Sequence, residues 1–176
     1  MSAPGRDVGI RLVRAGEWEA LRELRLRALT DTPDAFSTTM AQARARSEVE
    51  WREAARGGSV GERQATFVAD GPDGLIGMVT AFLDEPSDSA VGATLIQMWV
   101  APAARRAGVG RALVEALLAW CAQRGARGVR LSVNATLDRP IAFYEALGFQ
   151  DTGAREPLFP ERGVLAMEMQ RPTDSA

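Results

Sequence analysis

The sequence predicts a single domain of the α/β class, built on a central mixed sheet of about seven strands with four helices. Three observations indicate this class. The 176 residues are enough to bury one core, and 46% of them are hydrophobic. Short apolar runs alternate with amphipathic stretches of helical period. Residues 93–134 read as a strand, a helix and a strand, whose right-handed crossover makes the two strands parallel.

The expected element order is β-α-α-β-β-β-α-β-α-β-β. In chain order, the expected elements are strand 8–14, helices 17–29 and 47–56, strands 65–70, 75–83 and 93–100, helix 108–124, strand 128–134, helix 138–147, and strands 149–153 and 164–170. Residues 1–176 are expected to form one domain whose ends, 1–7 and 172–176, are flexible.

Local signals justify the elements of the first half. Apolar residues at helical spacing share a face of the first helix, which residues 30–33 break with a proline. Ser47 and Glu50 have the spacing of a capping box at the start of the second helix, and the glycine pair at 57–58 is expected to end it. The turn residues 71–74 indicate that the next two strands form a hairpin.

The second half contains the most informative segment, the turn 105–110, which reads Arg-Arg-Ala-Gly-Val-Gly. It follows an apolar strand and opens a long amphipathic helix. A helix start presents free backbone N–H groups and a positive dipole end to a phosphate. Gly108 and Gly110 let the main chain approach a ligand closely, and neighbouring arginines add charge-assisted hydrogen bonds. We therefore expect this turn to bind a phosphorylated cofactor.

Two common phosphate loops do not fit this turn. The loop of nucleoside triphosphatases requires Gly-Lys-Ser or Gly-Lys-Thr, and the chain contains no lysine. The dinucleotide fingerprint requires a third glycine three residues after the second, where Leu113 stands. The remaining pattern, R-x-x-G-x-G between strand and helix, resembles motif A of the GCN5-related N-acetyltransferase (GNAT) family. Taken alone, the pattern also suits an ordinary helix-start loop.

A second segment strengthens the resemblance. Residues 144–149 read Tyr-Glu-Ala-Leu-Gly-Phe, which is similar to the Y-E-x-L-G-F signature of the same family. Gly148 is expected to end the helix there, and Phe149 to begin the next strand. The resemblance implies a GNAT-like acyl-CoA N-acyltransferase fold over nearly the whole chain. It also implies an acetyl-CoA-dependent N-acetyltransferase that requires no metal.

The resemblance assigns roles to particular residues. Tyr144, the single tyrosine, is expected to be the general acid for the departing thiolate, or else a core phenol. Main-chain amides near Met98, Trp99 and Val100 are expected to stabilise the carbonyl oxygen, because the strand that carries them splays from its parallel neighbour and leaves room for pantetheine. The further residues expected to bind the cofactor are Arg105, Arg106, Gly108, Val109, Gly110, Arg111, Asn134 and Arg139.

The chain departs from the family pattern at several positions. Arg106 stands where the family often has glycine, and Leu137 where it usually has asparagine. Asn134 is a candidate replacement for that polar contact, although a polar strand end explains it equally well. The strand before motif A carries Gln97 in place of an acidic base. Acidic residues in the loop 84–92 are candidates for attracting a cationic amine, with a solvated loop as the plainer interpretation.

Composition excludes several kinds of chemistry. The chain has no histidine, so imidazole serves neither as a base nor as a metal ligand. Cys121, the single cysteine, is expected to be a buried core thiol. A net charge of −2 gives no electrostatic reason to expect nucleic acid as a partner. No signal region or membrane-spanning run is found, which predicts a cytoplasmic protein without a membrane partner.

The acceptor is left open by the sequence. A primary amine of a small molecule is the leading interpretation, and the N-terminus or a side chain of a protein is the alternative. A third interpretation is a non-catalytic module that binds acetyl-CoA and regulates a partner. The resemblance implies that residues 29–51 and 153–163 border the acceptor pocket, with Phe36 and Trp51 as pocket walls or core residues. Dimers are common in the family, so a homodimer stays open.

Overall fold

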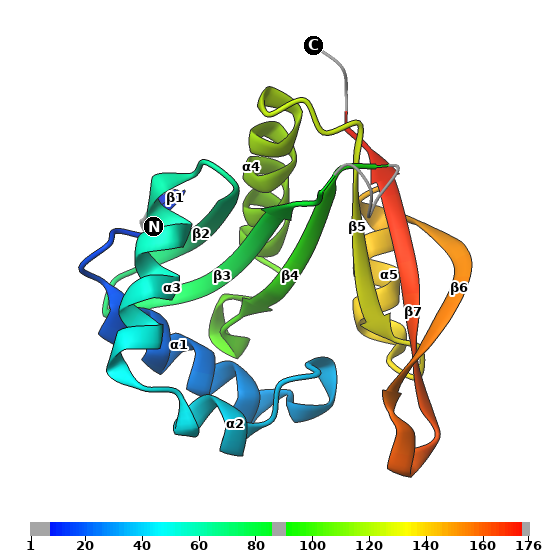
Figure 1. The fold of residues 1–176 in the computed structure, drawn as a ribbon, viewed down its shortest axis with the longest axis horizontal. Coiled ribbons are helices and arrows are strands. Elements are labelled where there is room, and N and C mark those ends of the chain that lie inside the picture. The colour runs from blue at the N-terminus through cyan, green and yellow to red at the C-terminus, as the bar shows by residue number, and fades with distance from the viewer. Residues whose placement is uncertain (1–7, 86–90, 174–176) are drawn as a thin grey trace, which may run out of the picture.

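A computed structural model describes residues 8–85 and 91–173 of the chain. Its centre is one seven-stranded mixed sheet in the order β1-β2-β3-β4-β5-β7-β6 (Figure 1). The strands are β1 (Ile10–Leu12), β2 (Gln64–Gly71), β3 (Gly74–Leu83), β4 (Ala93–Val100), β5 (Gly128–Asn134), β6 (Gln150–Phe159) and β7 (Val164–Pro172). Only β4 and β5 pair in parallel, and the other neighbours are antiparallel. The predicted α/β class with a mixed sheet is confirmed.

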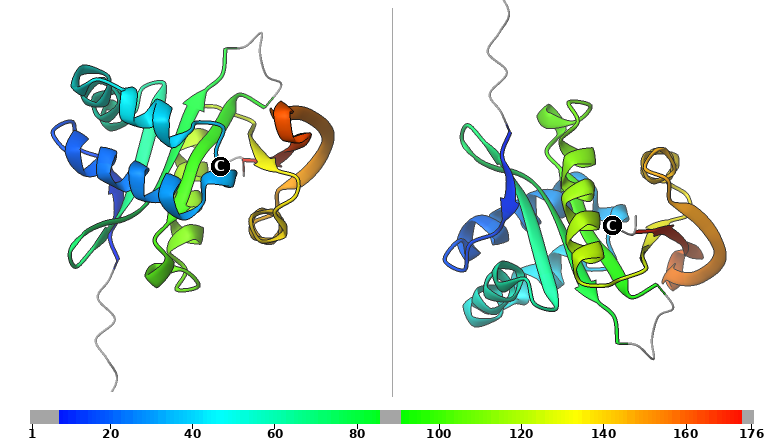
Figure 2. Two further views of the ribbon diagram at one scale, coloured as in Figure 1. Left: turned by 90° about the horizontal axis from the view of Figure 1, so that it is seen from below. Right: turned by 90° about the horizontal axis from the view of Figure 1, so that it is seen from above.

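Helices cover both faces of this sheet (Figure 2). The helices are α1 (Trp18–Asp31), α2 (Met40–Ala45), α3 (Glu48–Val60), α4 (Val109–Gln123) and α5 (Asp138–Ala146). The first three lie on one face, and α4 and α5 lie on the other. Successive side chains of a strand point to opposite faces, so Val68 packs toward α1 whereas Ala69 packs toward α4.

The expectation of four helices was one too few within the described residues. The additional helix is α2, which begins with a capping box in which Thr39 and Gln42 bond to each other's backbone. This T-x-x-Q signal is visible in the sequence, but a helix of six residues is too short to produce a clear period. The capping box of Ser47 and Glu50 is confirmed at the start of α3.

The ends of several elements also differ from expectation. Strand β6 runs on to Phe159, past the expected end at Gly153, because it pairs with β7 across a bulge. Strand β7 extends to Pro172, which pairs with Gly128, and the Thr173 amide donates to the Arg127 carbonyl. Residues 172 and 173 are therefore held by the sheet, whereas the expected flexible segments 1–7 and 174–176 lie outside the described residues.

The glycine pair at 57–58 does not end α3, which continues to Val60 and stops at the left-handed Gly61. Gly58 is buried where α3 crosses β2, and a Cβ there would lie 2.5 Å from Thr66 Oγ1. Close helix–sheet contact is therefore what selects glycine at this position. A Cβ on Gly57 would lie 3.1 Å from Gln64 Oε1, the end of a flexible side chain.

These contacts predict opposite outcomes for two adjacent substitutions. Gly58→Ala is expected to destabilise the fold by about 1–2 kcal/mol, since the overpacking cost exceeds the gain in helix propensity. Gly57→Ala, the matched control, is expected to be neutral or to stabilise by up to ~1 kcal/mol. Urea denaturation of the two variants checks this prediction, and equal unfolding midpoints would contradict it.

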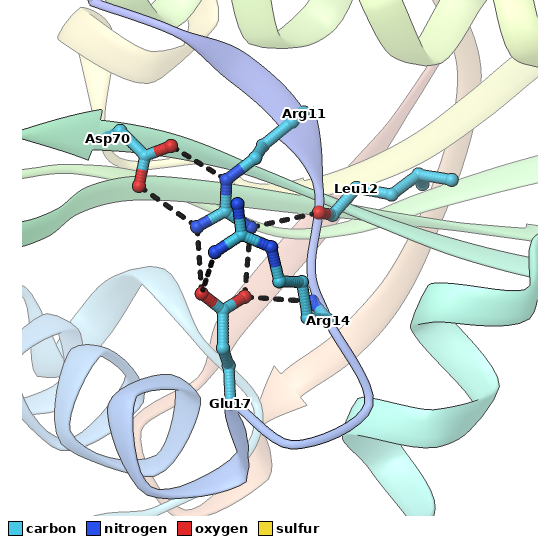
Figure 3. Close-up of polar contacts among 5 residues, drawn as sticks. All are labelled: Arg11, Leu12, Arg14, Glu17 and Asp70. Carbon is cyan, nitrogen blue, oxygen red and sulfur yellow. Dashed lines mark hydrogen bonds and ion pairs between the residues drawn. The ribbon is translucent and has the colours of Figure 1, made fainter.

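A polar network fixes the start of α1 against the sheet (Figure 3). The Arg11 guanidinium on β1 donates to both carboxylate oxygens of Glu17 at 2.8 Å, and to Asp70 on β2 at 2.6 and 3.0 Å. The pKa of Glu17 is lowered chiefly by its hydrogen bond to Arg11. The bidentate pair of Arg11 and Glu17 fixes the N-terminus of α1 relative to β1 and β2.

Candidate active site

The candidate site is a cleft of about 860 Å³ where β4 and β5 diverge. The only pair in register between these strands is Thr94 with Arg130, near the start of β4. From Leu95 onward, no residue of β4 has an in-register partner on β5, and the two ribbons separate (Figure 1). The end of β4, the following loop, α5 and the segment after α1 all line the cleft. The splayed strands implied by the resemblance are present.

A bulge in β4 shapes the wall of the cleft. Thr80 pairs with Ile96 and Met78 with Trp99, so β4 carries one more residue than β3 between these pairs. The extra residue is accommodated at Gln97, whose φ of 58° is unusual for a residue with a side chain. Bulges of this kind re-aim side chains and interrupt ladder pairing.

The residues predicted on β4 reach the cleft. Met98, Trp99 and Val100 all line it. Trp99 is 5% exposed, and its indole Nε1 donates to Asp31 Oδ2 at the end of α1 over 2.9 Å. The side chain of Trp99 thus joins α1 to the sheet, while its backbone belongs to the unpaired edge.

The glycine-rich turn between β4 and α4 has the geometry of an anion site. Arg106 and Gly108 both have left-handed backbones, with φ of 65° and 83°. Gly108 is the N-cap of α4, and the first helical hydrogen bond runs from the Ala112 amide to the Gly108 carbonyl. The amides of residues 109–111 therefore have no partner within the helix, and the positive end of its dipole adds to them. Alternating backbone conformations of this kind form a concave nest for anions.

Gly110 is required for a different reason from Gly108. A Cβ at Gly110 would lie 3.2 Å from Met98 Cε and from the ring of Phe143. The first turn of α4 thus packs directly against β4 and α5. A Cβ at Gly108 would meet nothing within 4 Å, so this glycine is selected by its positive φ and by the open space in front of it.

The predicted basic residues divide into two groups. Arg105 lines the cleft, but its Nε donates to the Val100 carbonyl at 2.8 Å and its Nη2 contacts Asp31. Arg105 therefore holds the turn against β4 and α1. Arg106, Arg111 and Arg139 line the cleft with exposed side chains, and Arg111 also pairs with Glu115.

Two predicted residues lie away from the cleft surface. Val109 is buried in the core at 5% exposure. Asn134 is 2% exposed and donates from Nδ2 to the Asp34 carbonyl at 3.0 Å, while its Oδ1 accepts from the Thr136 amide and hydroxyl. The side chain of Asn134 thus fastens the segment after α1 to β5.

Tyr144 lies in the wall of the cleft, on α5. It is 8% exposed, and its ring packs edge-on against Phe143 and Phe149 with centroid distances of 5.1 and 5.7 Å. Within the described residues its hydroxyl has no hydrogen-bond partner. Burial raises the pKa of Tyr144, so the phenol stays protonated throughout the neutral and mildly alkaline range.

Asp84 and Glu85 precede β4, and neither of them lines the cleft. Asp84 accepts from the Thr94 hydroxyl at 2.7 Å and lies 3.2 Å from Arg130, whereas Glu85 pairs with Arg63. Arginines thus neutralise Asp84 and Glu85, Asp88 lies outside the described residues, and attraction of the amine by the loop 84–92 stays a prediction. Among the described residues, Asp138 is the one carboxylate lining the cleft.

Three further residues help to form the site, and sequence reasoning missed one of them, Phe143. Phe143 precedes the signature of residues 144–149 and gave no signal of its own, because its contact with the turn depends on tertiary packing. Leu137, the substitute for asparagine, lines the cleft as the N-cap of α5 without a side-chain cap bond. Phe36, considered for the pocket or the core, is 9% exposed and lines the cleft as well.

The fold and the cleft together define a class of protein. The free edge of β4, the N-terminus of α4 and the phenol of Tyr144 all border one cavity. The resemblance to an acyltransferase that uses a CoA thioester implies this arrangement. Residues 18–149 match the sequence model of the acetyltransferase (GNAT) family. The chain belongs to this family and is an N-acetyltransferase.

Two named relatives are acetyltransferases of different kinds. The chain is 33% identical over 112 residues to the ribosomal protein bS18-alanine N-acetyltransferase of Escherichia coli K12, an alignment covering 62% of this chain and 71% of the relative. It is 32% identical over 156 residues to the mycothiol acetyltransferase of Thermobispora bispora, covering 83% of this chain but 44% of that protein.

A solved structure supports the fold independently. The yncA protein of Salmonella typhimurium, solved with its cofactor acetyl-CoA, superposes with a TM-score of 0.77 at 18% identity. The superposition covers 97% of this chain and 96% of the other. Within residues 8–85 and 91–173, no helix is long and apolar enough to cross a membrane, and no three metal-binding side chains gather.

Proposed function

We propose that this enzyme transfers the acetyl group of acetyl-CoA to a primary amine of a small molecule, by direct attack of the amine on the thioester. The observation that carries the proposal is the single cleft that joins the free edge of β4, the amides of residues 109–111 and Tyr144. The acetyl donor supplies the thioester, and the chain supplies binding, orientation and hydrogen bonds.

The diphosphate of the donor is assigned to the turn 105–111, which offers backbone amides and the exposed guanidinium groups of Arg106 and Arg111. Arg139 is assigned to the outer end of the cofactor. The unpaired edge of β4 at Met98, Trp99 and Val100 is assigned to pantetheine and the acetyl carbonyl, since main-chain groups without a strand partner can pair with an extended ligand.

Tyr144 is assigned the hydrogen bond to the sulfur as the thiolate departs. Burial raises the pKa of this phenol. Complete proton transfer to a thiolate whose thiol has a pKa of about 8.5 therefore costs more free energy than it would from a free tyrosine. Donation of a hydrogen bond to the developing negative charge does not require complete transfer. The absence of a partner for the hydroxyl within the described residues supports this role.

The rate is expected to rise with pH by about tenfold per unit below the pKa of the acceptor amine, because the attacking amine must be neutral. Tyr144 remains protonated across this range, since its raised pKa moves its titration further from neutrality. A pH profile of kcat/KM from about pH 6 to about pH 9.5 checks this expectation. A bell-shaped profile that falls before about pH 9 would contradict it.

A strap across the cleft favours a small acceptor over a peptide. The Asp34 carbonyl accepts from Asn134 on β5, and the Asp34 carboxylate pairs with Arg162, between β6 and β7, at 2.7 Å. The segment after α1 is thus tied across the gap between β4 and β5 at two points. A peptide chain needs an open groove, whereas a small amine does not.

The protein-directed alternative has one observation in its favour, the relative that acetylates a ribosomal protein alanine. A thiol-release screen with acetyl-CoA separates the candidates by offering small amines and alanine-starting peptides to the purified chain. Turnover of small amines supports the proposal, and turnover of peptides alone overturns it. Tight acetyl-CoA binding without turnover on either panel would indicate the non-catalytic module.

A further inference from the structure

A second cavity, of about 330 Å³, lies beside the cleft between α1, α3 and the strands β3 and β4. Ile96 and Gln97, at the bulge of β4, line both this cavity and the cleft. A molecule whose amine reaches the cleft at the bulge can therefore place another part of itself in the second cavity. The side chains that face this cavity decide what that other part is.

Arg25, on α1, lines this cavity and forms no ion pair with a carboxylate of residues 8–85 or 91–173. The residue is 4% exposed, and its Nη1 has no hydrogen-bond partner within the described residues. Its guanidinium carbon lies 4.2 Å from the centre of the Phe36 ring, which itself lines the cleft. Burial, with a smaller effect from Arg46, lowers the pKa of Arg25 to about 10, so the guanidinium remains charged at neutral pH. A buried cation without a counter-charge is costly to the fold.

Trp51, on α3, adds a second unsatisfied donor. It is 3% exposed, and its Nε1 has no hydrogen-bond partner within the described residues. The Arg46 guanidinium covers its ring at 4.4 Å and also lines the cavity. The nearby carboxylate of Glu50 is engaged by the Ser47 amide and hydroxyl, and Glu53 is exposed. Two cations, two carboxylates and an indole thus line the cavity, and its buried donors without a partner within the described residues are Arg25 Nη1 and Trp51 Nε1.

We propose that this cavity binds a carboxylate of the acceptor, so that the substrates are small amino acids whose amine is acetylated in the adjoining cleft. The inference rests on the proposed function and narrows its substrate class. A carboxylate offers acceptor oxygens to the planar guanidinium of Arg25 and to Trp51 Nε1, the two donors that lack partners. It also supplies the counter-charge that buried Arg25 lacks.

The experiment compares each standard amino acid with its α-carboxamide as acceptor, in the thiol-release assay with saturating acetyl-CoA. The carboxylates are expected to have the higher kcat/KM, by about 10- to 100-fold for the preferred side chain. Arg25→Met, which keeps roughly the length of the side chain, is expected to remove this preference, so that the two kcat/KM values become equal. Arg22→Met, on the exposed face of the same helix, is the matched control and should keep it.

The outcomes separate this inference from the proposed function. Equal rates for acids and amides, or a ratio that survives Arg25→Met, would overturn the inference while amine acetylation stands. If no acceptor releases thiol, the proposed function fails, and calorimetric binding of N-acetylglycine then decides the carboxylate site. Binding of N-acetylglycine to the parent chain that is lost in Arg25→Met supports the carboxylate site. Equal binding to the parent chain and to the variant overturns it.

A second variant covers the case in which Arg25→Met fails to fold. Trp51→Phe removes one donor, keeps an aromatic ring and leaves Arg25 in place. The ratio of kcat/KM for the amino acid to kcat/KM for its carboxamide is expected to fall by about 3- to 10-fold, which is the effect of one hydrogen bond to a charged group. An unchanged ratio in this variant would overturn the inference.

Discussion

Tyr144→Phe is expected to lower kcat by about 100-fold, the lower end of what a positioned acid contributes, and to leave acetyl-CoA affinity unchanged. The reason is that this change removes only the hydroxyl. Phenylalanine keeps the edge-on packing against Phe143 and Phe149. Steady-state kinetics on an acceptor from the thiol-release screen measure kcat, and calorimetry measures acetyl-CoA binding.

The thermal stability of the Tyr144→Phe variant is the control, because it shows whether the variant is still folded. Since the hydroxyl of Tyr144 has no hydrogen-bond partner within the described residues, its removal leaves no other polar group of the protein unsatisfied. The thermal midpoint of Tyr144→Phe should therefore equal or exceed that of the parent chain. An unchanged kcat in a stable variant would remove Tyr144 from the mechanism.

Gly108→Asp is expected to weaken acetyl-CoA binding by about 100-fold, which is ~2.7 kcal/mol. The aspartate would place a carboxylate beside the diphosphate assigned to the amides of residues 109–111, and like charges repel at short range. The Cβ itself would meet nothing within 4 Å, so the loss is not a consequence of a clash. Calorimetric titration of acetyl-CoA measures the change.

Gly125→Asp is the matched control. Gly125 follows the other end of α4 and has a φ of 80°, and a Cβ at this position would also meet nothing within 4 Å. The backbone strain of a side chain at positive φ, about 1 kcal/mol, is therefore similar at the two positions. Equal acetyl-CoA affinity in the two aspartate variants would contradict the assignment of the turn to the diphosphate.

The sequence was sufficient for the parts of the fold that local signals determine. The β-α-β unit, the capping box of Ser47 and the helix end at Gly148 follow from period, capping and glycine chemistry. The glycine-rich turn was placed correctly between β4 and α4, because strand, turn and helix signals follow one another there. The family assignment came from the same stretch.

The features of the fold and the site that the sequence did not predict depend on contacts between segments that are distant in the chain. Gly58 has the local signal of a helix breaker, yet it is selected by the approach of α3 to Thr66 on β2. The bulge at Gln97 has no sequence signal, since it reflects the pairing of β4 with β3. Arg25 has the spacing of a residue on the buried side of α1, and its missing partner becomes visible only with α3 and β4 in place.

The most direct test of the account is a crystal structure of the chain with acetyl-CoA. We expect the diphosphate within hydrogen-bond distance of the main-chain amides of residues 109–111, with the acetyl group beside the free edge of β4 and the thioester sulfur next to Tyr144. A diphosphate bound elsewhere, with these amides facing solvent or a side chain, would contradict it.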